Sequence, residues 1–113
     1  MDRKKELSNA YRQRPARGGV YSITNTATGR FLLSHDTDIQ SARNRFAFMA
    51  STGSCFDHAL EKDWKELGGK AFAFEVLEEL VRKDGQGRDE FAADLKALEQ
   101  LHRDRMDRSK EYR

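Results

Sequence analysis

The 113-residue chain contains one cysteine, one proline and one tryptophan. Because Cys55 has no second cysteine to pair with, an intramolecular disulfide is excluded. No stretch approaches the roughly 18 consecutive apolar residues of a membrane-spanning helix, and the charged N-terminus lacks the apolar segment of a secretory signal. These absences predict a cytoplasmic protein that does not enter membranes.

Neither sign of charge dominates, since 21 Lys and Arg stand against 19 Asp and Glu, for a net charge of +2. The charges are unevenly distributed along the chain. Residues 1–17 hold six basic side chains and two acids, whereas residues 75–99 hold eight acids and four bases. A basic N-terminal arm suits contacts with nucleic-acid phosphates, and a solvated chain end is the alternative interpretation.

Hydrophobic periodicity and turn residues predict seven elements. Helices are expected where apolar residues recur every three to four positions, over 2–12, 39–50, 57–67 and 89–107. Strands are expected where β-branched and aromatic residues gather, over 20–25, 30–34 and 71–77. The order α-β-β-α-α-β-α predicts an α+β fold, in which helices flank a three-stranded sheet.

Local signals predict where several of these elements begin and end. Gly29 can adopt a positive φ and is expected to close a hairpin turn. Asp38 is expected to cap the helix over 39–50, because its carboxylate can accept a hydrogen bond from a backbone N–H of the first turn. Residues 14–19, which hold a proline and two glycines, are expected to interrupt regular structure.

The same signals predict one domain with two appendages. A basic arm is expected over residues 1–18, the folded domain over 19–107, and a charged tail over 108–113. The tail holds few apolar residues and is expected to be frayed.

Several segments resemble the GIY-YIG nuclease family. Gly19-Val20-Tyr21 resembles the first tripeptide of the family name, with valine for isoleucine, and Phe31-Leu32-Leu33 occupies the place of the second. Further segments resemble the helix that carries the family's arginine, its third strand and its final helix: Asn44-Arg45-Phe46, Phe74 to Glu79, and Leu98 to His102. The resemblance implies a three-stranded antiparallel sheet flanked by helices.

The resemblance also implies hydrolysis of DNA phosphodiester bonds with a divalent metal ion, Mg²⁺ or Mn²⁺. It implies that Glu99 holds the metal, since Mg²⁺ prefers hard oxygen ligands. It implies that the guanidinium of Arg45 stabilises the negative charge of the transition state. Tyr21 is then the group expected to take a proton from the attacking water. Arg43, on the same predicted helix, is the alternative to Arg45.

Other residues complete the predicted site. His35 follows the second strand, and an imidazole can act as a base or as a donor to phosphate near neutral pH. An exposed loop histidine is the alternative interpretation of His35. Arg43, Arg17 and Phe31 are expected to contact the DNA.

The second motif departs from the family pattern at two positions. Phe31 lacks the hydroxyl of the family's tyrosine, and Leu33 replaces its glycine. Loss of one hydrogen-bond donor to a transition state costs on the order of 10²-fold in rate. Two functions are therefore expected. One is a metal-dependent endonuclease acting on DNA, and the alternative is a catalytically weak or inactive module of the same fold that binds nucleic acid or a protein partner.

Overall fold

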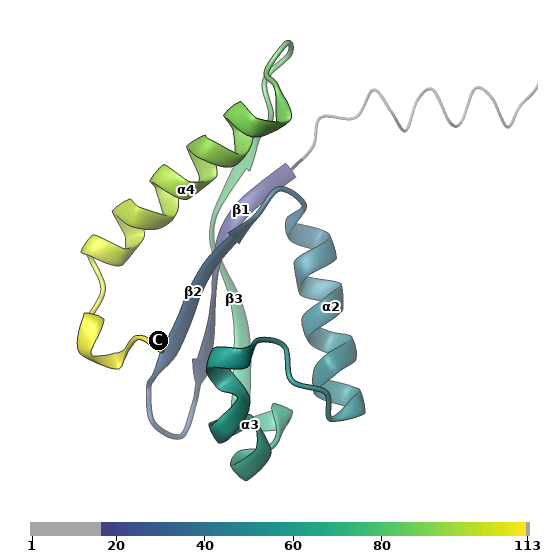
Figure 1. The fold of residues 1–113 in the computed structure, drawn as a ribbon, viewed down its shortest axis with the longest axis vertical. Helices are drawn as coiled ribbons and strands as arrows, with labels where there is room; N and C mark the ends of the chain where they lie inside the picture. Colours follow the sequence, from purple (N-terminus) through teal and green to yellow (C-terminus); the bar gives the residue numbers. More distant parts are fainter. Residues whose placement is uncertain (1–16, 113) are drawn as a thin grey trace, which may run out of the picture.

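A computed structural model describes residues 17–112 (Figure 1). Within this range the strands are β1 (Arg17–Asn25), β2 (Phe31–Asp36) and β3 (Phe72–Val81). The α-helices are α2 (Ile39–Thr52), α3 (Glu61–Leu67) and α4 (Arg88–Asp104), and short 3-10 helices occupy His58–Leu60, Gly69–Ala71 and Arg108–Lys110. The helix predicted over 2–12 lies outside the described residues. None of the helices in residues 17–112 is long and apolar enough to cross a membrane.

β1 is the central strand of a three-stranded antiparallel sheet with the order β2-β1-β3. It is joined to β2 by a short turn in which Gly29 has a φ of 79°, as the sequence predicts. β1 is buried along most of its length, because it has a strand on each side and helices over both faces. The predicted α+β fold with its antiparallel sheet is thereby confirmed.

The register of β1 decides which residues share a face of the sheet. Tyr21 lies opposite Ser34 of β2, whereas Val20 lies opposite His35. Because successive side chains of a strand project to opposite faces, these two pairs point in opposite directions. A bulge between Val20 and Tyr21 shifts the pairing with β3, and Glu78 of β3 lies opposite Val20.

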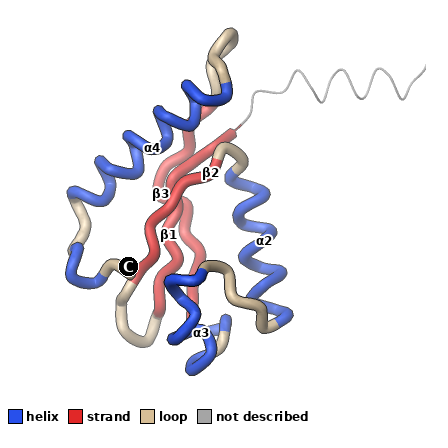
Figure 2. The backbone as a smooth tube through the Cα atoms, viewed as in Figure 1, coloured by secondary structure: helices blue, strands red, loops and turns tan. Residues whose placement is uncertain are grey.

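Two cores form on the two faces of the sheet. α2 and α3 cover one face, and α4 covers the other (Figures 1 and 2). The core under α2 and α3 contains the buried residues Tyr21, Ile23, Ile39, Ala42, Leu60, Trp64 and Phe72. The core under α4 contains Val20, Phe31 and Leu33, against which Leu98 and Met106 pack. The sheet therefore separates the surroundings of Tyr21 from those of α4.

The boundaries of α2 agree with the prediction, and those of α3 differ. Asp38 caps α2 by accepting a backbone N–H at 3.0 Å, and Gly53 ends the helix with a φ of 82°. The helix predicted over 57–67 is divided, because Asp57 caps a 3-10 turn and α3 begins only at Glu61.

The sheet is longer than predicted at one end. β1 begins at Arg17 and includes Gly18 and Gly19, where the sequence predicts an interruption. β3 continues to Val81, although the predicted strand ends at Leu77. Glycine in the interior of a strand weakens the strand, but Gly18 and Gly19 allow neighbouring groups to approach the backbone closely.

The C-terminal segment is packed, which corrects the prediction of a frayed tail. Tyr112 is 6% exposed, and its backbone N–H donates to the carbonyl of Phe31 at 2.7 Å. Its hydroxyl donates to Asp63 at 2.6 Å and accepts from Asn25 at 3.1 Å. The guanidinium of Arg30 lies 4.3 Å from the centre of its ring. Most residues of this segment are charged, so its composition does not indicate that Tyr112 holds it against the sheet.

Replacing Gly19 by serine is expected to destabilise the fold. An added Cβ would lie 2.7 Å from the backbone oxygen of Glu78 and 3.3 Å from Ile39, and the backbone cannot rotate away. We expect the free energy of unfolding to fall by about 1–3 kcal/mol in urea denaturation. Gly87→Ser is the matched control, because nothing lies within 4 Å of its added Cβ and serine is a favoured helix cap. Equal losses in the two variants would contradict the close packing of β1.

Candidate functional site

Tyr21 lies on the face of the sheet covered by α2 and α3, and it is only 3% exposed. Its ring stacks on Phe74 of β3, with 4.9 Å between the ring centroids, and meets Phe56 edge-on at 6.2 Å. Phe46 of α2 packs against both of these phenylalanines. We call these four residues the Tyr21 cluster.

The surroundings of the Tyr21 hydroxyl disfavour its ionisation. Burial raises the pKa of the phenol above its ordinary value of 10.0. A hydrogen bond with Ser34 and the charge of Arg45 lower this pKa in part, while Asp36 and Asp57 raise it further. A phenol of this kind is protonated at neutral pH. It can donate a hydrogen bond, but it is a poor general base.

Arg43 and Arg45 are exposed residues of α2 at the rim of the Tyr21 cluster. The guanidinium of Arg45 lies 4.6 Å from the centre of the Phe56 ring, and that of Arg43 lies 6.0 Å from the centre of the Phe74 ring. Cations at these distances are attracted by the faces of aromatic rings. α2 contains no Asp or Glu that could pair with either arginine along the helix, and a guanidinium is a geometric match for phosphate oxygens.

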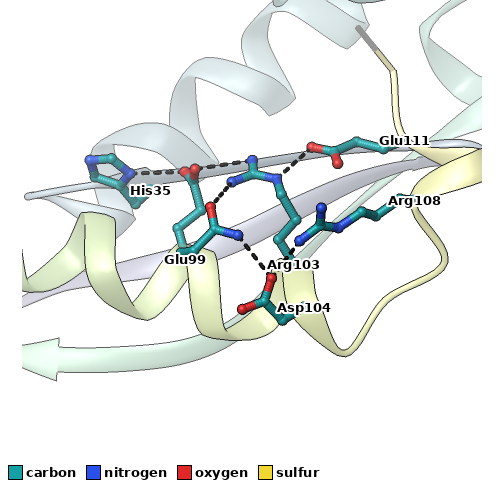
Figure 3. Close-up of polar contacts among 7 residues, drawn as sticks. His35, Glu99, Arg103, Asp104, Arg108 and Glu111 are labelled. Carbon is teal, nitrogen blue, oxygen red and sulfur yellow. Dashed lines mark hydrogen bonds and ion pairs between the residues drawn. The ribbon is translucent and has the colours of Figure 1, made fainter.

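His35 and Glu99 lie on the other face of the sheet, under α4. Nδ1 of His35 is 2.9 Å from Oε1 of Glu99 (Figure 3). The two side chains are 27% and 14% exposed. A carboxylate at one ring nitrogen orients an imidazole and leaves the other nitrogen to exchange a proton. The pair therefore has the arrangement of a positioned base.

Two further residues, a cation and an anion, extend this pair. Nη2 of Arg103 lies 3.1 Å from Oε2 of Glu99, and Nε of Arg103 donates to Glu111 at 2.9 Å (Figure 3). We call His35, Glu99, Arg103 and Glu111 the α4 network. Arg103 is not among the residues predicted from the sequence, although its i, i+4 spacing from Glu99 is a signal that indicates such a contact. No comparable signal marks Glu111, which reaches the network only through the turn after α4.

The structure does not bring Tyr21, Arg45 and Glu99 into one pocket. Tyr21 and Arg45 belong to the face under α2, and Glu99 belongs to the face under α4. Two adjacent residues of β2 show the division, since Ser34 meets Tyr21 and His35 meets Glu99. The two groups of residues therefore approach the same point of β2 from opposite faces.

Phe31 and Leu33 are core residues, which corrects two expectations about the second motif. Phe31 is 5% exposed and packs under α4, so its ring presents no surface to DNA. The register places Leu32, not Phe31, on the face of the sheet that carries Tyr21. Leu33 faces the α4 core, so its side chain does not crowd the Tyr21 cluster.

Arg17 is exposed and stands at the start of β1, opposite Val81. Tyr21 lies four positions further along the strand, which corresponds to about 13 Å. The proposed phosphate contact of Arg17 is thus distinct from the Tyr21 cluster.

The surroundings of Glu99 do not suit Mg²⁺, which requires oxygen ligands in near-octahedral geometry. Oε1 of Glu99 is engaged by His35 and Oε2 by Arg103, whose positive charge occupies the place that a cation would take. Among the described residues 17–112, no group of three or more His, Cys, Asp or Glu side chains could hold a metal ion. The residues present therefore do not match the metal site that the family resemblance implies.

The architecture matches that of a known nuclease domain. The catalytic domain of the homing endonuclease I-TevI is similar to this chain with a TM-score of 0.60 at 19% identity. The match covers 84% of this chain and 95% of that domain. No protein-family model and no curated protein matches the sequence. The chain therefore has the GIY-YIG nuclease fold, and at this identity the similarity speaks for the fold alone.

The Tyr21 hydroxyl is expected to ionise only above pH 10. Its folded pKa is raised above the unfolded value of 10.0, so its contribution to stability is complete below pH 10 and is lost as the pH rises through the folded pKa. The ultraviolet absorbance of phenolate, followed in wild type and in Tyr21→Phe, should differ by one step above pH 10. A step near neutral pH would instead restore Tyr21 as a general base.

Glu99→Gln is expected to lower stability by about 1 kcal/mol, because it removes a charge-assisted contact that is partly exposed to water. An ion bound to the folded state would stabilise it and raise the melting temperature. We expect no such binding, so Mg²⁺ should raise the melting temperature of the wild type no more than NaCl of equal ionic strength does. Glu66→Gln, an exposed carboxylate of α3, is the control. A stabilisation by Mg²⁺ that disappears in Glu99→Gln alone would demonstrate a metal site at Glu99.

Proposed function

We propose that this chain is a DNA-binding domain of the nuclease fold that hydrolyses DNA at most weakly. The observation that carries the proposal is the difference in charge between the two helices α2 and α4. α2 holds two arginines and no acid, whereas α4 holds five acids and three Lys or Arg. A polyanion is attracted to the first surface and repelled by the second.

Arg43 and Arg45 are the groups proposed to contact phosphates. A guanidinium presents a planar fork of donors that matches two phosphate oxygens. The rings of Phe74 and Phe56 lie below these two side chains, which limits the conformations that they must give up on binding. We assign Arg17 an auxiliary contact at the end of the sheet.

We expect weak hydrolysis because Tyr21 is protonated and Glu99 is already engaged by other side chains. The Tyr21 phenol is held in its neutral form by burial. One oxygen of Glu99 forms an ion pair with Arg103, and the other is within hydrogen-bond distance of His35. Removing one electrostatic contribution of this kind costs about 10²- to 10³-fold in rate. The loss of a free metal-binding carboxylate and of Tyr21 as a general base together leaves binding as the proposed main capacity of the domain.

Divalent-metal-dependent endonuclease activity is the second candidate, and one observation favours it. The Tyr21 cluster and the α4 network reach the same point of β2, at Ser34 and His35. A phosphodiester bound at this point of β2 would face a phenol and a guanidinium on one side and an imidazole on the other. Water would attack phosphorus and pass a proton to His35, while the bond to the leaving oxygen would break and that oxygen would take a proton from solvent.

Binding of duplex DNA, followed by fluorescence anisotropy at several salt concentrations, tests the first proposal. Arg43→Ala with Arg45→Ala should weaken binding and reduce the slope of log affinity against log salt by about 1 to 2, because about one counterion is released for each phosphate contact. Arg88→Ala with Lys96→Ala removes the same charge from α4 and should leave the slope unchanged. Absence of salt-sensitive DNA binding by the wild type would refute the proposal.

Nicking of supercoiled plasmid with Mg²⁺ or Mn²⁺ distinguishes the two candidates. Efficient cleavage by the wild type would establish the endonuclease if Glu99→Gln abolishes it. The Glu99→Gln variant must still melt cooperatively, which shows that it is folded. Retention of DNA without cleavage is the result expected from the structure.

A further inference from the structure

We propose that α2 enters the major groove of duplex DNA and that Gln40 and Asn44 contact the edges of the bases there. This inference rests on the proposed DNA binding and deepens it. It names the surface that meets the DNA and the residues that distinguish one sequence from another.

α2 has an inner and an outer face along its whole length. The residues of α2 that pack in the core with the sheet and α3 are Ile39, Ala42, Phe46 and Ala50, which recur mostly every three to four positions. The residues on the opposite side are all exposed and form a second row, which we call the outer stripe: Gln40, Asn44, Ala47, Phe48 and Ser51. The outer stripe is uncharged, so an element that approaches it meets amides, small side chains and one phenylalanine.

The two arginines of α2 flank the outer stripe. A helix turns about 100° per residue, so Arg43 and Arg45 project to either side of Asn44. Their ring contacts agree with this, because Arg43 leans toward Phe74 of β3 and Arg45 leans toward Phe56 of the following loop. An uncharged row between two cations matches a groove of DNA, where base edges lie between two phosphate backbones.

The dimensions of α2 suit the major groove. Its 14 residues give a rod about 21 Å long and about 10–12 Å wide with side chains, and the major groove of B-DNA is about 12 Å wide. Ala47 and Ser51 are small and permit close approach. Phe48 is 66% exposed, which is unusual for a phenylalanine, and it is placed to contact the methyl group of thymine.

Gln40 and Asn44 are paired in a way that suits one base. Nε2 of Gln40 donates to Oδ1 of Asn44 at 3.0 Å. Oε1 of Gln40 then remains as an acceptor, and the amino group of Asn44 remains as a donor. In the major groove, adenine presents the N6 amino donor and the N7 acceptor. The amide pair is therefore complementary to an A·T base pair.

Other partners fit the outer stripe less well. Single-stranded nucleic acid is held by aromatic rings on which bases stack. In the Tyr21 cluster, Tyr21 is buried and the three phenylalanines are partly buried and packed on one another, and Phe48 stands by itself on the stripe. The centre of a protein interface is typically depleted of charge and rich in apolar contacts. The outer stripe offers amides bordered by cations.

Selection of binding sites from random duplex DNA tests the inference. The wild type should enrich sites with an A·T pair at a fixed position, and discrimination against other base pairs there should be about 5- to 150-fold. Gln40→Ala with Asn44→Ala should still bind duplex DNA but with discrimination near unity. Replacing the selected adenine by 7-deazaadenine should weaken binding of the wild type and leave the double variant unaffected. Gln100→Ala removes an exposed amide from α4 and is the control.

The outcomes separate this inference from the proposed function. Both substituted side chains are exposed, so the melting temperature should confirm that the double variant is folded. Salt-sensitive duplex binding without sequence selection, or selection that the double variant retains, would overturn the inference and leave DNA binding in place. Stronger binding to single strands would also overturn it. Absence of all DNA binding would overturn both proposals.

Discussion

Two adjacent residues of the central strand, Gly18 and Gly19, set the distance between the sheet and both of its helical layers. At Gly18 a side chain would come within 2.8 Å of Leu95, on α4. At Gly19 a side chain would meet the backbone of β3 and lie 3.3 Å from Ile39, on α2. Protein interiors tolerate overlaps of this size poorly. The positions of α2 and α4, and hence of every candidate functional residue that they carry, depend on this absence of side chains.

The elements of the fold could be predicted from local patterns, because local chemistry specifies them. Asp38 caps α2, and Gly29 supplies the positive φ of the hairpin, as their positions in the sequence indicate. The face on which each strand residue falls is set by register, and a shift of one residue reverses every side chain. For this reason Phe31 appeared to be a surface residue, whereas Leu32 is the one that shares a face with Tyr21.

Long-range partners were the least predictable part of the structure. Tyr112 bonds to Asn25 and Asp63, which are 87 and 49 positions away in the chain. No periodicity or capping signal marks a contact at that separation. The candidate site shows the same limitation, because the sequence predicts Tyr21 and Glu99 as partners while the sheet separates them. Glu99 finds its partners instead in His35 across the core and in Arg103 one turn further along α4.

The pairing of β1 with β3 has a consequence for how the chain acquires its structure. The hairpin of β1 and β2 closes over a short turn, but the paired residues of β1 and β3 lie from 47 to 64 positions apart. Joining segments so distant costs chain entropy before any contact repays it, so we expect this pairing to be the slow step of sheet assembly. Until it forms, one edge of the central strand offers unsatisfied backbone groups to other chains. During synthesis on the ribosome, this edge of β1 can pair with other chains until residues 72–81 have emerged and formed β3.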